Sequence, residues 1–245
     1  MANKNIYESF HQGTRSQSKI VTGNNFTYRH IIYFIDKYLT KNTKVLDIGC
    51  GAGTLCFYIA NKGNRVLGFD ISIKAIKACN ESAKILGLDK LVKFQAVDFP
   101  TRSVNGRFDL IIFSEVIEHL SDDNLALRKI SKMLNQKGVV VITTPSRNAP
   151  LHRLGYAKGF DKRVGHLRRY EIQDLSKQCE AVGFKIIETH KIEGILRNFL
   201  YLSPVAGKLV RFIKFFLSDV VTFADNLTIP IFGESNIIVV ARKGN

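Results

Sequence analysis

Cysteines are few in this sequence and long apolar runs are missing, and both features exclude classes of protein. The four cysteines form no CxxC pair and none of the spacings that hold zinc (Cys50, Cys56, Cys79 and Cys179). A chain of 245 residues can bury a sizeable core without disulfides, so we expect a reducing, cytoplasmic compartment. The first ten residues lack the apolar run of a signal peptide. Since no stretch of about 18 apolar residues occurs, we expect no membrane-spanning helix.

Acidic residues are also scarce, at 21 Asp and Glu against 36 Lys and Arg, which gives a formal net charge of +15. This excess favours an anionic partner such as nucleic acid, an acidic membrane face or a phosphorylated substrate. Solubility alone is the alternative explanation of the charge. The hydrophobic share of 45% is ordinary for a globular core and excludes a disordered chain.

Short apolar runs of strand length alternate with segments of helical periodicity. We expect strands at 44–48, 65–69, 91–97, 108–113, 137–144, 184–190 and 236–241, and helices at 26–39, 54–61, 72–87, 122–134 and 171–181. Thr54 and Ser72 are the expected N-caps, and residues 146–170 are expected to form a polar, basic loop. Continuous apolar strands between helices predict a Rossmann-like, doubly wound α/β sheet. We expect one domain over 1–245, with an N-terminal helical cap (1–43) and an amphipathic insertion (194–234).

A glycine-rich turn follows the first expected strand, in the segment VLDIGCGAG (45–53). Glycines suit a place where a ligand approaches the backbone too closely for side chains. A pyrophosphate is one candidate ligand, but the carboxylate of Asp47 would repel it and attract an ammonium group. Asp70 can accept both hydroxyls of a ribose, and Asp98 can accept from an adenine amino group. The alternative is that Asp70 and Asp98 only cap turns or helices.

The segments VLDIGCGAG, GFDIS, VDF, FDLIIFSEVIEHL and KGVVVITTPS resemble, in order and spacing, the motifs of class I S-adenosylmethionine-dependent methyltransferases. The resemblance covers about residues 45–145. It implies a seven-stranded, mostly parallel sheet whose last strand is antiparallel, and S-adenosylmethionine as the cofactor. The cofactor residues that it implies are Asp47, Gly49, Cys50, Gly51 and Gly53 around the methionine part, Asp70 at the ribose, Asp98 and Phe99 at the adenine, and Ile71 and Ser114 elsewhere in the site.

Acidic and imidazole side chains follow the fourth expected strand directly. If a helical turn starts at Glu115, then Glu118 and His119 share a face with it, and such a set suits a hard or borderline divalent metal. His166 could complete the set, or His152 in its place. This ExxEH pattern resembles ubiquinone-pathway O-methyltransferases and small-RNA 3′-terminal 2′-O-methyltransferases.

In the RNA group the pattern holds a magnesium-type ion, so the resemblance implies Glu115, Glu118, His119 and His166 as ligands. The alternative is a site without metal, in which His119 packs or caps locally or, with His166, is a candidate catalytic base.

Two basic segments bear on the substrate. Seven basic residues crowd the expected loop and are typical of a phosphate or phospholipid contact, unless they are merely solvated (Arg147, Arg153, Lys158, Lys162, Arg163, Arg168 and Arg169). Residues 205–220 have the pattern of a basic amphipathic helix, which suits a membrane surface or a lid over an apolar substrate. Equally, this helix could simply pack on the domain or form a dimer face. Arg29 is a weaker candidate, for the carboxylate of the cofactor.

Together these features predict a methyltransferase that acts on a hydroxyl of a small, lipid-like or lipid-linked molecule. A metal-dependent RNA 2′-O-methyltransferase is the alternative, although the basic loop lacks the interleaved aromatics typical of RNA binding. A fold kept only as a scaffold for partners is a third possibility. We expect a cytoplasmic protein that attaches peripherally to the anionic inner membrane face, and a homodimer is a further candidate assembly.

Overall fold

The apolar runs of the sequence become the strands of one sheet. In the computed structural model, which describes residues 8, 13, 16–102, 105–202 and 217–244, seven strands lie in the order β3-β2-β1-β4-β5-β7-β6. Their bounds are β1 (Lys44–Ile48), β2 (Arg65–Asp70), β3 (Val92–Ala96), β4 (Phe108–Ser114), β5 (Leu134–Pro145), β6 (Phe184–Ile192) and β7 (Asn236–Lys243). Strand β7 runs antiparallel to both of its neighbours, and the other pairs are parallel. The predicted sheet with an antiparallel last strand is therefore confirmed.

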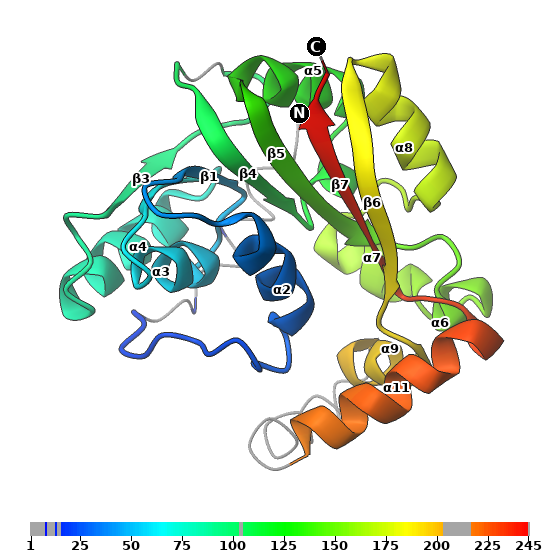
Figure 1. The fold of residues 1–245 in the computed structure, drawn as a ribbon. Helices are drawn as coiled ribbons and strands as arrows, with labels where there is room; N and C mark the ends of the chain where they lie inside the picture. The colour runs from blue at the N-terminus through cyan, green and yellow to red at the C-terminus, as the bar shows by residue number, and fades with distance from the viewer. Residues whose placement is uncertain (1–7, 9–12, 14–15, 103–104, 203–216, 245) are drawn as a thin grey trace.

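Helices cover both faces of this sheet (Figure 1). Helices α2 (Arg29–Tyr38), α3 (Thr54–Ala60) and α4 (Ile73–Ile85) share one apolar core with the sheet. Helices α5 (Asp123–Met133) and α8 (Ile172–Ala181) share a second core on the opposite face. Because both faces are buried, the central strands contain continuous apolar runs, such as residues 110–113 and 139–142, rather than an alternating pattern.

The helix starts follow local capping chemistry, with one correction. Ser72 is the predicted N-cap, and its Oγ accepts a hydrogen bond of 3.2 Å from Ala75 N. The expectation that Thr54 caps α3 is wrong, because Thr54 is the first helical residue and Gly53 is the N-cap. Gly53 has φ +79, a left-handed conformation that favours glycine, and a Cβ there would lie 2.9 Å from the Phe57 ring.

The stretch expected to be a loop contains two short helices, which corrects the prediction. They are α6 (Pro150–Arg153), with proline at its first position, and α7 (Lys158–Val164), which ends at Gly165 in a left-handed conformation. Between β6 and β7 lie α9 (Ile195–Leu202) and α11 (Ser218–Phe232). They pack together beyond the ends of β6 and β7 (Figure 1).

The predicted amphipathic helix at 205–220 falls mostly on 203–216, outside the described residues. In the described part of the chain, every helix is too short or too polar to cross a bilayer.

Candidate active site

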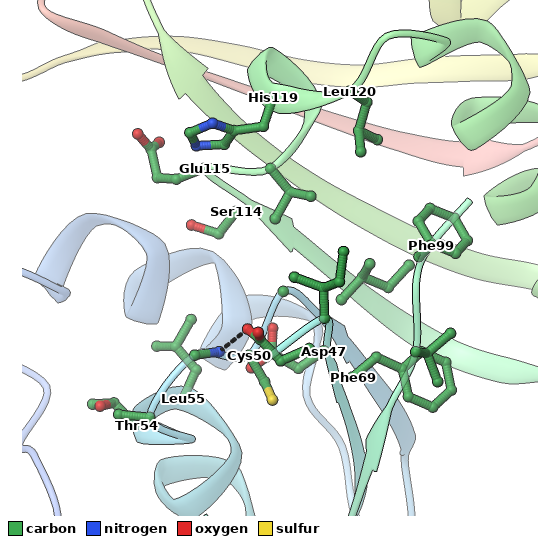
Figure 2. A pocket seen from close by; sticks show the side chains of 18 of the residues that line it. Asp47, Cys50, Thr54, Leu55, Phe69, Phe99, Ser114, Glu115, His119 and Leu120 are labelled. Carbon is green, nitrogen blue, oxygen red and sulfur yellow. Dashed lines mark hydrogen bonds between the residues drawn. The ribbon is translucent and has the colours of Figure 1, made fainter. Parts of the chain in front are cut away.

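A cavity of about 500 Å³ opens at the carboxyl ends of β1, β2 and β4. Most of the predicted cofactor residues line it: Asp47, Gly49, Cys50, Gly51, Asp70, Ile71, Phe99 and Ser114. Gly53 and Asp98 are not among the lining residues, although Val97 and Phe99 on either side of Asp98 are. Figure 2 shows Ser114, Glu115 and His119 along one side of this cavity, with Asp47 and Cys50 on the facing side. We call it the first cavity.

Asp47 is buried beneath the glycine turn. Its side chain is 3% exposed, and the Sγ of Cys56 donates to its Oδ2 over 3.2 Å. Burial, together with the charge of nearby Asp70, raises the pKa of Asp47 to about 7. An ammonium group in the first cavity would supply a positive counter-charge for this carboxylate.

The glycine turn is held against the end of β2 by backbone hydrogen bonds. The amides of Gly49 and Cys50 both donate to Phe69 O, at 2.8 and 2.7 Å. Gly49 has φ +78, and a Cβ on it would lie 2.3 Å from the Cγ2 of Val116, so the turn leaves no room for a side chain there. The backbone of this turn is therefore what faces a ligand.

Asp70 is oriented by two backbone amides, one on each carboxylate oxygen. Gly51 N donates to Oδ2 over 2.8 Å, and Ser72 N donates to Oδ1 over 2.9 Å. The turn-capping role considered for Asp70 is therefore real. Each carboxylate oxygen has a further lone pair, so this role leaves both oxygens able to accept from a ribose.

A second cavity of about 340 Å³ adjoins the first and shares Tyr28, Ser114 and Glu115 with it. Its other walls include Phe160 of α7 and Asn198 of α9. His119 lines the first cavity and His166 lines the second. This pair of histidines therefore lies where the two cavities meet.

Glu118, His119 and His166 converge at this junction, and we call them the acid–histidine cluster. Their candidate ligand atoms lie within 4.8 Å of one another. Glu118 is fully buried; its Oε2 accepts from Thr144 Oγ1 over 3.0 Å, and its Oε1 lies 3.9 Å from the Nε2 of each histidine. Among the described residues, this Oε1 has no hydrogen-bond partner.

The Nδ1 atoms of both histidines are bonded on the side away from Glu118. His119 Nδ1 lies 3.1 Å from the carbonyl of Gly165, and His166 Nδ1 lies 2.9 Å from the carboxylate of Asp161. A carbonyl can only accept, so His119 carries its proton on Nδ1, and the neutral ring turns the Nε2 lone pair toward Glu118. Burial lowers the pKa of His119 to about 4, which favours this neutral ring.

Asp161 is held in place by Arg169, and it therefore fixes the orientation of the His166 ring. Burial acts to raise its pKa, but hydrogen bonds from His166 and Arg169 outweigh burial and hold the pKa below its ordinary value. Arg169 donates to both carboxylate oxygens, at 2.6 and 3.0 Å. His152, considered in place of His166, has its Nδ1 3.4 Å from the same carboxylate and does not join the cluster.

Glu115 does not join the acid–histidine cluster, contrary to its predicted place beside Glu118 and His119. The expected helical turn from Glu115 does not form, because Glu115 has φ +55 and the short 3₁₀ helix η1 spans Ile117–His119. The carboxylate of Glu115 accepts instead from Thr143 Oγ1 over 2.8 Å. Burial raises the pKa of Glu115 to about 7.

Three of the seven basic residues after β5 are held in ion pairs that the sequence did not reveal. Arg147 pairs with Glu171 and Asp174, Arg168 with Asp123, and Arg169 with Asp161. Their acidic partners mostly belong to other elements, so counting charges within the loop missed them. Arg29 contacts Asp219 of α11 and lines neither of the two cavities, so the structure does not place it at the cofactor.

The sequence reasoning missed Tyr28, Glu193 and Arg197. Tyr28 lines both cavities, and nothing in its sequence context marks it. Arg197 is fully buried, and its guanidinium lies 2.8 Å from Glu193, which lines the second cavity. The spacing of four residues between Glu193 and Arg197 on a helix start could have indicated this ion pair.

The sheet order, the glycine turn and the acid after β2 together define the class of α/β fold that binds a nucleotide-like cofactor at the carboxyl ends of its strands. Within this class, residues 39–200 match the family described as "Methyltransferase domain". The match covers more than half of the chain, so the chain belongs to this family, and the predicted class of protein is confirmed.

Relatives support the same class over part of their length. The ubiquinone biosynthesis O-methyltransferase of Nitrobacter winogradskyi is 35% identical over 112 residues, which cover 46% of this chain and 42% of that protein. The enzyme of the same name from Chromobacterium violaceum is 31% identical over 122 residues, covering 49% and 53%. The chain thus spans about half the length of these relatives.

A solved structure shares the fold. Phosphoethanolamine N-methyltransferase 2 of Haemonchus contortus, in complex with S-adenosyl-L-methionine, superposes with a TM-score of 0.68 at 16% identity, covering 99% of this chain and 57% of that one. At this identity the likeness supports the fold alone.

Proposed function

We propose that this chain transfers the methyl group of S-adenosylmethionine to a hydroxyl of a small, lipid-like or lipid-linked molecule. The observation that carries the proposal is the acid–histidine cluster at the junction of the two cavities. It offers proton acceptors or metal ligands at the place where a cofactor in the first cavity would meet an acceptor in the second. The O-methyltransferase relatives favour oxygen as the methylated atom.

In this proposal the first cavity holds the cofactor. Asp47 binds the ammonium of the methionine part and Asp70 the ribose hydroxyls, while Phe99 packs beside the adenine and Asp98 accepts from its amino group. Gly49, Cys50, Gly51 and Gly53 form the turn around the methionine part, and Ile71 and Ser114 complete the wall. The acceptor oxygen attacks the methyl carbon, the bond from carbon to sulfur breaks, and S-adenosylhomocysteine leaves.

The acceptor's proton must go to a nearby base, and the cluster provides one. With Nδ1 of His119 protonated, Nε2 is the ring nitrogen that carries the lone pair and can act as the proton acceptor, and His166 offers a second acceptor facing the second cavity. The buried carboxylate oxygen of Glu118 and the two imidazole nitrogens near it also fit a divalent cation. Histidine ligands commonly donate an N–H from their second ring nitrogen to a carbonyl or carboxylate, as here.

We therefore include a divalent metal, held by Glu118, His119 and His166, with Glu115 as a neighbouring carboxylate. One carboxylate and two imidazoles suit a borderline ion such as Mn²⁺ better than Mg²⁺, which prefers oxygen ligands. A bound ion of this kind lowers the pKa of a coordinated hydroxyl.

A methyl-transfer screen tests the proposal. Protein incubated with tritiated S-adenosylmethionine and separate lipid and RNA extracts should label the lipid fraction. Label in RNA alone would replace the proposal with the RNA 2′-O-methyltransferase, which the net charge of +15 favours. Transfer to neither fraction would contradict both.

The metal has its own test, which does not depend on the acceptor. Calorimetry with Mn²⁺ should show one site in the wild-type protein and none in Glu118→Gln, while the exposed control Glu180→Gln binds like wild type. Once an acceptor is known, chelation should abolish turnover and leave cofactor affinity unchanged. Full activity in chelator would remove the metal and leave His119 and His166 as bases.

We also propose how the parts of the chain serve this site. Residues 1–245 form one methyltransferase unit, in which the cap (1–43) contributes Tyr28 to both cavities and the insertion (194–234) contributes Asn198 and Leu202 to the second. The protein works in the cytoplasm and reaches its acceptor at the inner face of the membrane. A homodimer is the competing use of the insertion.

A further inference from the structure

Helix α11 turns polar side chains toward the protein and apolar side chains toward solvent. Thr222 and Asp225 are buried. Four apolar side chains, 59% to 74% exposed, form what we call the outward stripe: Val220, Phe223, Leu227 and Ile231. Their spacing of three or four residues places them on one helix face. A helix that merely covers a domain has the opposite polarity, because its apolar face packs on the core.

The buried polar face fixes this orientation. The carboxylate of Asp225 accepts from the amides of Gly194 and Arg197, at 2.7 and 3.0 Å, at the start of α9. Backbone amides at a helix start need such acceptors. Thr228 adds its Oγ1, which accepts from Ile195 N over 3.1 Å. Rotating α11 to bury the outward stripe would break these contacts.

Further exposed apolar groups lie on the elements that adjoin the stripe. On α9, which packs against α11, Leu196 and Phe199 are 42% and 55% exposed. Helix α6 also packs against α9. In the turn between α6 and α7, Leu154 and Tyr156 are 67% and 74% exposed. Large exposed apolar side chains on helices that pack against one another mark an interaction site.

Charge identifies the partner. Four of the basic residues on α6 and α7 are exposed: Arg153, Lys158, Lys162 and Arg163. An anionic bilayer surface attracts a protein that exposes apolar side chains, a tyrosine and basic residues on neighbouring elements. A second copy of this chain would carry the same formal net charge of +15, and this like charge opposes association of two copies.

We infer that the outward stripe of α11 inserts at the boundary between headgroups and acyl chains of an anionic phospholipid bilayer, with the exposed basic residues of α6 and α7 meeting the headgroups. The helix lies on the membrane, in agreement with the finding that no described helix can span one. Because α9 joins α11 to the wall of the second cavity, this contact places that cavity near the bilayer surface. The inference holds whatever the methyl acceptor is.

Vesicle flotation of the full chain tests it. We expect the protein to float with vesicles of phosphatidylglycerol and phosphatidylcholine in equal parts at low salt, and much less with pure phosphatidylcholine or at high salt. Phe223→Ser combined with Leu227→Ser should lower the partition coefficient at least tenfold, because two large apolar side chains no longer enter the bilayer. Cofactor affinity, measured by calorimetry, should not change in this variant.

A matched control separates binding through the outward stripe from nonspecific hydrophobic adsorption to vesicles. Ile85 on α4 is as exposed as Leu227, at 59%, but lies on another part of the molecule (Figure 1). Ile85→Ser should float like wild type. Equal flotation of the stripe variant and wild type would overturn the inference. So would a wild-type dimer in light scattering that the stripe variant converts to monomer, since the stripe would then be a dimer face. Failure of methyl transfer, with flotation intact, would count against the proposed reaction alone.

Discussion

In the proposed function, Asp47 links cofactor binding to pH, because burial holds its pKa near the middle of the physiological range. The value is about 7 without a ligand. An ammonium group bound beside it favours the ionised carboxylate, so the pKa of Asp47 falls when the cofactor binds. Binding then releases a proton below pH about 7, and affinity must rise with pH in that range.

We therefore expect the affinity for S-adenosylmethionine to rise about tenfold per pH unit from about pH 5 to about pH 7, and to level off above. Asp47→Asn should bind weakly and lose this dependence, since it has no proton to release. Calorimetry across this range gives both results. A flat profile for the folded wild-type protein would show that Asp47 does not face the ammonium.

At the scale of elements, helix α9 is anchored to the rest of the fold by a buried arginine. The Arg197 guanidinium pairs with Glu193 at 2.8 Å and lies over the Phe26 ring at 4.2 Å. Arg197→Met keeps the volume but leaves Glu193 buried without its cation, which should cost about 3 kcal/mol of unfolding free energy.

The surface pair of Arg29 with Asp219 is the matched comparison, because the Asp219 side chain is 77% exposed. Arg29→Met should cost no more than about 1 kcal/mol. Urea unfolding followed by circular dichroism measures both variants. Equal costs would mean that the buried pair contributes nothing beyond a surface contact.

Elements that are buried on both sides could be predicted from sequence, and those that depend on a tertiary partner could not. Strands β4 and β5 contain continuous apolar runs because helices cover both faces of the sheet. Helices α6 and α7 are short and polar, so no periodicity marks them. The inward polar face of α11 makes sense only beside the start of α9.

The same distinction holds within the site. Asp47 and Asp70 could be predicted because each follows from its place at the end of a strand. The sequence predicted that Glu118, His119 and His166 lie together. It did not predict that Glu115 lies outside this cluster, because that depends on the positive φ of Glu115. Tyr28 comes from a distant helix start, and no local pattern places it at the cavities.

For the molecule as a whole, a bound cofactor should stabilise the fold by contacting several loops at one edge of the sheet. The first cavity is lined by the turns after β1, β2, β3 and β4, so a ligand there contacts segments far apart in the sequence. A ligand that binds the folded chain alone stabilises it by about 2.7 kcal/mol at a concentration a hundred times its dissociation constant. For a chain of this size, S-adenosylmethionine should therefore raise the melting temperature by roughly 5–10 °C.

Asp70→Ala tests whether this stabilisation depends on the predicted contact between Asp70 and the ribose. Loss of a charge-assisted hydrogen bond, worth about 1.5–3 kcal/mol, weakens affinity at least tenfold, so the same cofactor concentration should raise the melting temperature by about half as much or less. Because Asp70 also accepts from Gly51 and Ser72, the variant melts lower without ligand, and the shift on adding cofactor is the quantity to compare. Asp89→Ala, at an exposed position that lines neither cavity, should keep the full shift. If the Asp70 variant shows the full shift as well, the cofactor does not bind through Asp70.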